Sequence, residues 1–157
     1  MFFSYAPEIP RAALWLRSFL TPWEKTNSKP LAQAVGRPVR GPVLSGFGAK
    51  AKGLRNDGIN IAAQRGAPVM AAEHGVVAYA GNELRGFGNL LLIKHANGWI
   101  TAYAHNDTLL VRRGDRVERG QRIATVGATG NVRSPQLHFE LRRGRIAEDP
   151  EKHLRGA

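Results

Sequence analysis

From Gly36 onward the chain alternates short apolar runs with glycine, and this alternation limits the fold more than any other sequence feature. The runs are rich in β-branched and aromatic residues, which favour strands. They cover residues 42–47, 58–63, 67–72, 75–81, 89–95, 99–105, 122–127 and 136–141. Regular short strands between glycine turns are typical of antiparallel sheets in a small sandwich or open barrel. We therefore expect one all-β domain over residues 36–157.

The Asn97-Gly98 pair lies between two of these runs, residues 89–95 and 99–105. Asn-Gly is the pair that most favours a tight turn between two antiparallel strands, because both residues tolerate positive φ. The sequence therefore predicts that these two runs form a hairpin.

Residues 1–35 differ from the rest of the chain. Pro10 suits the first turn of a helix, where its missing N–H does no harm. The apolar residues that fall on one face of such a helix are Ile9, Ala13, Leu16 and Leu20. We expect an amphipathic helix and a polar linker over residues 1–35. Three interpretations stay open: a helix packed on the main domain, the remnant of a longer upstream region, or a mobile segment that covers a groove.

Composition excludes several function classes. The chain has no cysteine, which excludes disulfides, thiolate metal ligands and a cysteine nucleophile. No apolar run approaches the ~20 residues of a membrane-spanning helix, and the N-terminus lacks the basic start of a secretory signal. We expect no membrane span, and a signal peptide is not recognisable in this chain.

The formal net charge of +11 raises the question of a polyanionic partner. The basic residues are spread along the expected strands and turns, and neither a recognition helix nor an aromatic RNA-binding signature accompanies them. We therefore expect no nucleic-acid partner. Two interpretations stay open: a solvated basic surface, or attraction to an acidic partner.

Polar residues recur at even spacing in two of the expected strands. Asn56 and Asn60 share one face of the first, with Asp57 expected on the opposite face. Gln136 and His138 share one face of the last. His138 alone is compatible with a metal ligand or with an ordinary half-buried imidazole. A zinc hydrolase needs three His, Asp or Glu ligands, and carboxamides are poor substitutes for them.

The order of these segments resembles the zinc peptidases of the lysostaphin/LytM family over roughly residues 36–154. The segments that carry the resemblance are N-D-G-I-N at 56–60, Y-A-H at 103–105 and Q-L-H-F-E at 136–140. In that family the first motif, H-x-G-x-D, supplies two zinc ligands, and the last, H-L-H-F-E, supplies a catalytic histidine and the third ligand. The Y-A-H strand supplies the other catalytic histidine.

The resemblance implies a LytM-like β domain whose zinc site is degenerate. Asn56 and Asn60 stand at two ligand positions, and Gln136 stands at one catalytic position. His105 and His138 remain. We therefore expect no bound metal and no cofactor, and we expect His138 to hydrogen-bond to Asn60 or Gln136.

Within the family, the chain is similar to non-catalytic members represented by EnvC, NlpD and DipM. The resemblance implies a periplasmic factor that binds and activates N-acetylmuramyl-L-alanine amidases during cell division. The expected partner-binding groove is lined by Asn56, Asn60, Tyr103, His105, Gln136 and His138, and its rim carries Lys52, Arg55 and Arg133. Two alternatives stay open: a zinc endopeptidase with an unusual ligand set, and a passive peptidoglycan-binding module.

Overall fold

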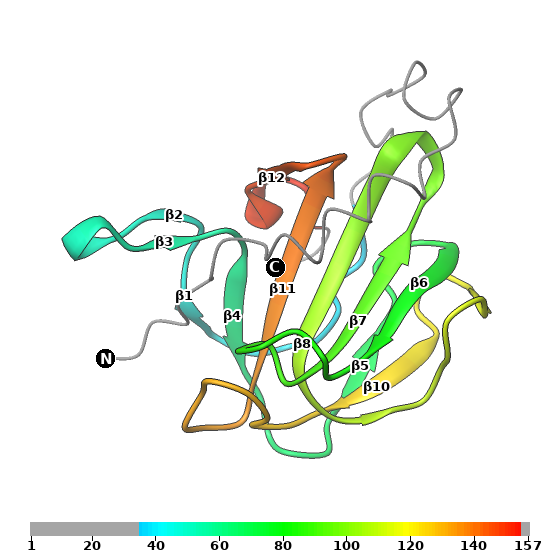
Figure 1. Cartoon of the computed structure of the whole chain (residues 1–157), viewed down its shortest axis with the longest axis horizontal. Helices are drawn as coiled ribbons and strands as arrows, with labels where there is room; N and C mark the ends of the chain where they lie inside the picture. The colour runs from blue at the N-terminus through cyan, green and yellow to red at the C-terminus, as the bar shows by residue number, and fades with distance from the viewer. Residues whose placement is uncertain (1–34, 155–157) are drawn as a thin grey trace.

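Antiparallel strands are the main regular structure of the computed structural model, which describes residues 35–154 (Figure 1). The strands are β1 Val43–Ser45, β2 Gly48–Ala49, β3 Arg55–Asn56, β4 Ile59–Ala62, β5 Pro68–Met70, β6 Gly75–Gly81, β7 Asn89–Lys94, β8 Trp99–Leu109, β9 Arg116–Val117, β10 Arg122–Val126, β11 Gln136–Arg143 and β12 Ile146–Glu148. Short 3-10 turns are η2 Ala51–Gly53, η3 Ala96–Gly98 and η4 Pro150–Lys152. The helix and linker expected before residue 35 lie outside the described residues.

Ten of the described strands form one open sheet. Its main path runs β1-β4-β11-β8-β7-β6-β9, while β10 pairs with β5 and β8, and β12 pairs with β11. The sheet does not close into a barrel. β2 and β3 form a separate hairpin that projects from the sheet (Figure 1). The all-β, antiparallel fold expected from the glycine-separated runs is confirmed.

The long strand β11 lies at the centre of the sheet, between β4 and β8, and it is buried on both faces. Leu137, Phe139 and Leu141 are fully buried on one face, and the first two belong to the main hydrophobic core. The alternate residues from Gln136 to Arg142 are polar and also buried. Because side chains alternate along a strand, one face of β11 contributes to the core and the other carries a polar site.

The hairpin expected at Asn97-Gly98 is confirmed: β7 pairs with β8 across η3. Asn97 has φ 63° and Gly98 has φ 79°. These positive φ angles are the conformation that Asn and Gly adopt at low cost. The turn sets the register of β8 against β7.

The two ends of the described chain meet. The Val35 amide donates to the His153 carbonyl at 2.8 Å, and Val35 forms an isolated parallel bridge with Leu154. Asp149 caps the short turn η4 by accepting from the Glu151 amide at 3.0 Å. Val35 is fully buried in the main core, with Leu154 packed against that core. The first and last described residues therefore close the domain together.

Within residues 35–154, none of the helical turns has the length and apolarity that crossing a membrane requires.

Candidate functional site

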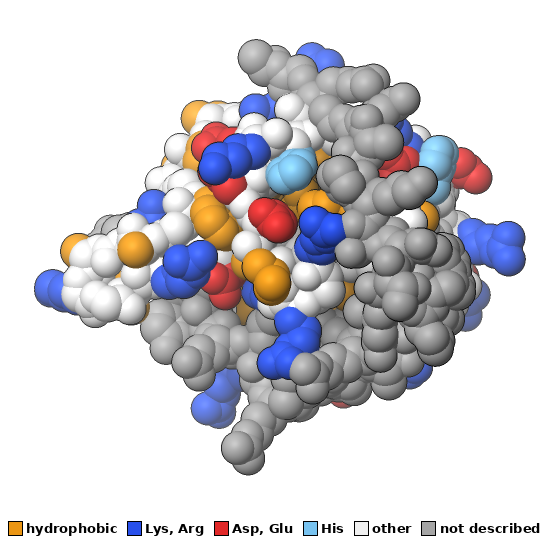
Figure 2. Space-filling model, turned by 90° about the horizontal axis from the view of Figure 1, so that it is seen from above, with side chains coloured by type: hydrophobic (Ala, Val, Ile, Leu, Met, Phe, Trp, Pro, Cys, Tyr) orange, Lys and Arg blue, Asp and Glu red, His pale blue; other side chains and the backbone are white. Residues whose placement is uncertain are grey.

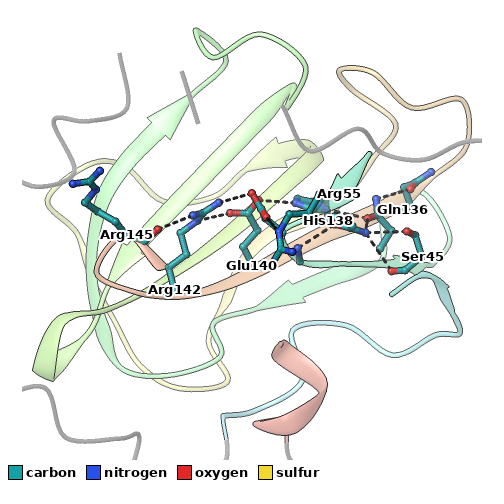
Figure 3. Close-up of polar contacts among 11 residues, drawn as sticks. Ser45, Arg55, Gln136, His138, Glu140, Arg142 and Arg145 are labelled. Carbon is teal, nitrogen blue, oxygen red and sulfur yellow. Dashed lines mark hydrogen bonds and ion pairs between the residues drawn. The ribbon is translucent and has the colours of Figure 1, made fainter. Parts of the chain in front are cut away.

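A row of hydrogen-bonded polar side chains follows β11 and continues onto the neighbouring strands (Figure 3). We call this set the polar row; its members are Ser45, Asn56, Asp57, Asn60, Gln136, His138, Glu140 and Arg142. All except Asp57 are buried. The pairing of β11 with β4 sets His138 directly opposite Asn60, so residues far apart in the sequence meet through sheet register.

Carboxamides form one end of the polar row. The Asn56 side-chain Nδ2 donates to Ser45 Oγ at 2.9 Å and to Asn60 Oδ1 at 3.1 Å. Asn60 Nδ2 in turn donates to Gln136 Oε1 at 2.9 Å. The Gly58 backbone amide donates to Asn56 Oδ1 at 3.0 Å. The three carboxamides therefore satisfy one another, as buried polar groups require.

This network also fixes the protons on His138. The Gly58 amide can only donate, so Asn56 must turn its oxygen toward Gly58 and its Nδ2 toward Asn60. Asn60 then presents its oxygen to Nδ1 of His138, at 3.0 Å. The other ring nitrogen, Nε2, lies 2.9 Å from Glu140 Oε1. Both ring nitrogens face acceptors, so the arrangement is satisfied when His138 carries two protons and a positive charge.

Glu140 and Arg142 continue the row as buried charges. Arg142 Nε donates to Glu140 Oε2 at 2.7 Å, and Arg142 Nη2 lies 3.4 Å from Asp57 Oδ2. Burial raises the pKa of Glu140, but the hydrogen bond from His138 and the charge of Arg142 outweigh burial and hold that pKa at about 2. Glu140 is therefore ionised, and it balances the charge on His138.

Asp57 does not lie on the opposite face from the two asparagines, as its position in an extended strand had led us to expect. It falls in the turn between β3 and β4, where strand alternation no longer applies. There it accepts from Arg55 Nε at 3.0 Å and reaches Arg142. The row thus runs through alternating charges from buried His138 to exposed Arg55.

His105 lies beside the polar row because β8 breaks its alternation there. Its φ is 66°, in the left-handed region that a histidine seldom adopts. The His105 and His138 rings are 6.1 Å apart, centroid to centroid. On β8, Ala104 is paired with His138 and Tyr103 with Phe139. Regular alternation would have put His105 on the Tyr103 face, and the positive φ instead turns it toward His138.

The His105 ring is held in one orientation. Its Nδ1 lies 2.7 Å from the Thr129 carbonyl and must donate to it. Burial and the nearby charge of His138 lower the pKa of His105 to about 4, although the Thr129 bond opposes this change. His105 is therefore neutral near pH 7, with its lone pair on Nε2.

The placement of Tyr103 in the groove was wrong. Tyr103 is fully buried in the main core on the opposite face of β8, with its ring 5.4 Å from Phe139. Its hydroxyl accepts from the Ala72 amide at 2.9 Å, and burial raises its pKa to about 12. Sequence reasoning assigned Tyr103 and His105 to one face because it could not foresee the positive φ at His105.

A third buried histidine, His95, lies on the Tyr103 side of the sheet. His95 Nδ1 lies 2.6 Å from the His74 carbonyl, and its Nε2 lies 2.7 Å from Thr101 Oγ1. Thr101 Oγ1 is in turn 2.9 Å from the Tyr103 hydroxyl. Burial lowers the pKa of His95. These hydrogen bonds are all satisfied when His95 is neutral and donates through Nδ1 to the His74 carbonyl.

The expected rim residues Lys52, Arg55 and Arg133 are all exposed. Arg55 also has a structural role, since its guanidinium stacks 5.1 Å from the Phe47 ring centroid and pairs with Asp57. Figure 2 shows Lys and Arg side chains spread over the described part of the viewed face, with acidic side chains among them.

The polar row does not fit a zinc ion. Asn56 and Asn60, at the positions where the resemblance implies two zinc ligands, are neutral carboxamides whose Nδ2 groups donate to neighbours. Nδ1 of His138 points its proton at Asn60 and so has no lone pair to offer a metal. Within residues 35–154, no three His, Asp or Glu side chains are grouped so that they could hold a metal. No metal-dependent step follows from these residues.

Sequence reasoning found the asparagines, Gln136 and His138, and the structure brings these together with His105. It missed Ser45 and Arg142 as members of the row. Arg142 did carry a signal, because it continues the alternation of Gln136, His138 and Glu140 along one face of β11. Ser45 carried none, because it enters through the pairing of β1 with β4 opposite Asn60.

The chain is similar to known proteins by family, by sequence and by structure. The model of peptidase family M23 matches residues 54–150. Cell division protein DipM of Caulobacter vibrioides is 47% identical over 130 residues, which cover 81% of this chain and 21% of DipM. Murein hydrolase activator NlpD of Escherichia coli is 48% identical over 117 residues, covering 74% of this chain and 30% of NlpD.

Among solved structures, a zinc-containing peptidase from Vibrio cholerae matches with a TM-score of 0.68 and 34% identity, covering 75% of this chain and 39% of that one. This chain spans well under half of the length of DipM and NlpD. The family match covers more than half of the chain, and it includes Asn56, Asn60 and the whole of β11. The chain belongs to peptidase family M23.

Proposed function

We propose that this chain is a non-catalytic M23 domain that binds and activates peptidoglycan amidases during cell division and envelope remodelling, in the periplasm. The observation that carries the proposal is the locked polar row. Asn56, Asn60 and Gln136 use their polar groups on one another and on His138, so neither a metal nor a metal-bound water has a place in the chemistry.

Loss of the metal does not require loss of the surface around it. Neutral carboxamides at positions 56, 60 and 136 avoid buried uncompensated charge, so β3, β4 and β11 keep their arrangement. The relatives support a binding role, since one is named a murein hydrolase activator and another a cell division protein. A protein segment can use a surface that once fitted a peptide substrate.

The proposal is tested by dye release from labelled sacculi. The chain is added to a purified N-acetylmuramyl-L-alanine amidase, and we expect faster release than with the amidase alone. The chain without amidase should release no dye, whether zinc is present or chelated. Release by the chain alone, sensitive to a chelator, would instead indicate an endopeptidase. Sedimentation with sacculi but no effect on the amidase would indicate a passive wall-binding module.

Charge reversal at the rim tests which surface meets the amidase. Lys52→Glu combined with Arg133→Glu should weaken activation, chiefly by slowing association, and the effect should shrink as salt increases. Arg116→Glu with Arg122→Glu is the matched control. It makes the same change in net charge at exposed positions on β9 and β10. Equal loss in both double variants would contradict a specific rim.

A further inference from the structure

His105 differs from every member of the polar row because one of its ring nitrogens lacks a partner. Nδ1 is engaged with the Thr129 carbonyl, and Nε2 has no hydrogen bond within the described part of the chain. In residues 35–154, Asn106 Oδ1 is the one side-chain polar atom that is both sealed from solvent and unpartnered. Nε2 of His105 is not sealed in this way, so it stays within reach of a ligand although the residue is only 3% exposed.

The surrounding structure maintains a strained backbone to present this ring. A non-glycine residue at positive φ costs about 1–3 kcal/mol and persists only when its surroundings hold it. The His105 amide donates to the Phe87 carbonyl at 2.8 Å. The next residue is held too: Asn106 Nδ2 donates to the Asn89 carbonyl at 2.9 Å, and the Asn106 carbonyl accepts from Thr129 Oγ1 at 2.7 Å.

These contacts fix the chemistry that Nε2 can offer. Because Nδ1 must donate to Thr129, neutral His105 has a lone pair on Nε2 and acts there as a hydrogen-bond acceptor. A ligand must therefore bring an N–H or O–H donor. A cationic donor is disfavoured, since the charged His138 ring lies 6.1 Å away and the rim carries Lys52 and Arg133. A neutral backbone amide meets both conditions.

We propose that Nε2 of His105 is a recognition atom that accepts a hydrogen bond from a backbone N–H of the bound amidase segment. This inference rests on the proposed function and assigns one contact within it. The residue in the family's catalytic position would thus serve binding in this chain. Its neighbours Thr129 and Asn106 are positioning residues for that contact.

The test compares the affinity of the purified amidase for the wild-type chain and two variants. His105→Phe keeps the ring shape and removes the acceptor. His105→Asn tolerates positive φ better but is too short to replace Nε2, so it serves if the Phe variant folds poorly. His74→Phe is the control for loss of an exposed imidazole. Thermal unfolding is measured for all, and the same proteins are sedimented with sacculi.

We expect both His105 variants to bind the amidase roughly threefold to tenfold more weakly, the effect of one hydrogen bond, while His74→Phe binds like wild type. Wild-type affinity in a folded His105 variant would overturn the inference and leave the proposed function intact. If the wild type does not bind the amidase, the proposed function fails. The inference assigns a contact with the amidase and therefore fails with it, and weaker binding of the His105 variants to sacculi would then assign the acceptor to a wall peptide instead.

A ring 15N spectrum gives a readout that a purely structural role would not move. In the free wild type we expect the His105 signals of the neutral form with the proton on Nδ1. On addition of the amidase, the Nε2 signal should shift in the direction expected for an acceptor of a hydrogen bond. An unchanged Nε2 signal in the bound protein would overturn the assignment.

Discussion

At positions where the resemblance to the zinc peptidases implies metal ligands, a carboxamide differs from a ligand in more than charge, because it brings an N–H donor in place of a lone pair. At Asn60 the amide oxygen faces Asn56 and His138, while the new donor faces Gln136. The Gly58 amide fixes the orientation of the Asn56 carboxamide, and Asn56 in turn fixes that of Asn60. The proton state of His138 is therefore set by a backbone amide in the turn between β3 and β4, and its charge requires Glu140.

Glu140→Gln should destabilise the fold strongly. Glu140 is buried between His138 and Arg142, and removing it leaves two buried cationic groups without their common partner. Breaking a buried ion pair in this way costs about 3–5 kcal/mol. The free energy of unfolding in urea measures the loss. Exposed Glu83→Gln is the control and should stay within about 0.5 kcal/mol of wild type; a similarly small change at Glu140 would contradict the ionised row.

Glu140 also contributes a pH dependence of known sign. Its folded pKa of about 2 lies below its ordinary value. Its contribution to stability is therefore complete above the unfolded pKa and is lost as pH falls toward 2.

His95 should make stability fall as pH drops through the range below its ordinary pKa. Burial lowers its folded pKa, so below about pH 6.5 the unfolded chain binds the proton more readily than the folded chain. The stabilisation is present above pH 6.5 and is lost as pH falls. We compare wild type with His95→Gln by urea unfolding between pH 8 and pH 5. The stability difference between them should shrink toward low pH; a constant difference would exclude neutral His95.

Among the elements, β8 is a regular strand until His105, where its positive φ redirects the side chain. Two segments from elsewhere in the chain hold this break: residues 86–89 and residues 127–131. Gly88 has φ 63°, and a Cβ there would overlap the side chain and carbonyl carbon of Thr129, which accepts from Nδ1 of His105. The geometry of β8 at the site thus depends on a glycine outside it.

Gly88→Ala should therefore be more damaging than its backbone angle alone implies. Gly144→Ala is a matched control, since Gly144 has φ 62° but open space where a Cβ would go. The control should lose about 1–2 kcal/mol of unfolding free energy for the positive φ. Gly88→Ala should lose more, because Thr129 must move, and overpacking adds about 1–3 kcal/mol. Equal losses would show that the Thr129 contact is not tight.

Strand positions were predictable where a strand repeats an apolar pattern, and unpredictable where it does not. The Asn97-Gly98 hairpin and the central strand β11 were readable because turn chemistry and alternation act within a few residues. The short strands β2 and β12 escaped prediction, because two or three residues are too few to show a period. Tyr103 was misplaced by the same rule of alternation that placed His138 correctly.

At the scale of the molecule, the family resemblance could be recognised from the sequence. The hydrogen bonds and ion pairs within the site could not. The motif spacing led to Asn56, Asn60, Gln136, His105 and His138. The charged half of the polar row depends on Arg142, Glu140 and Asp57, which come together through the register of β11 and the turn after β3. Such contacts depend on three-dimensional pairing, so a linear pattern could not specify them.

Val35 and Leu154 lie side by side, joined through the His153 carbonyl and a parallel bridge. The two ends of the described domain are therefore adjacent to each other. In a longer polypeptide, a domain with adjacent ends is attached at one place on its surface. The rest of its surface is then left open for contacts with other molecules.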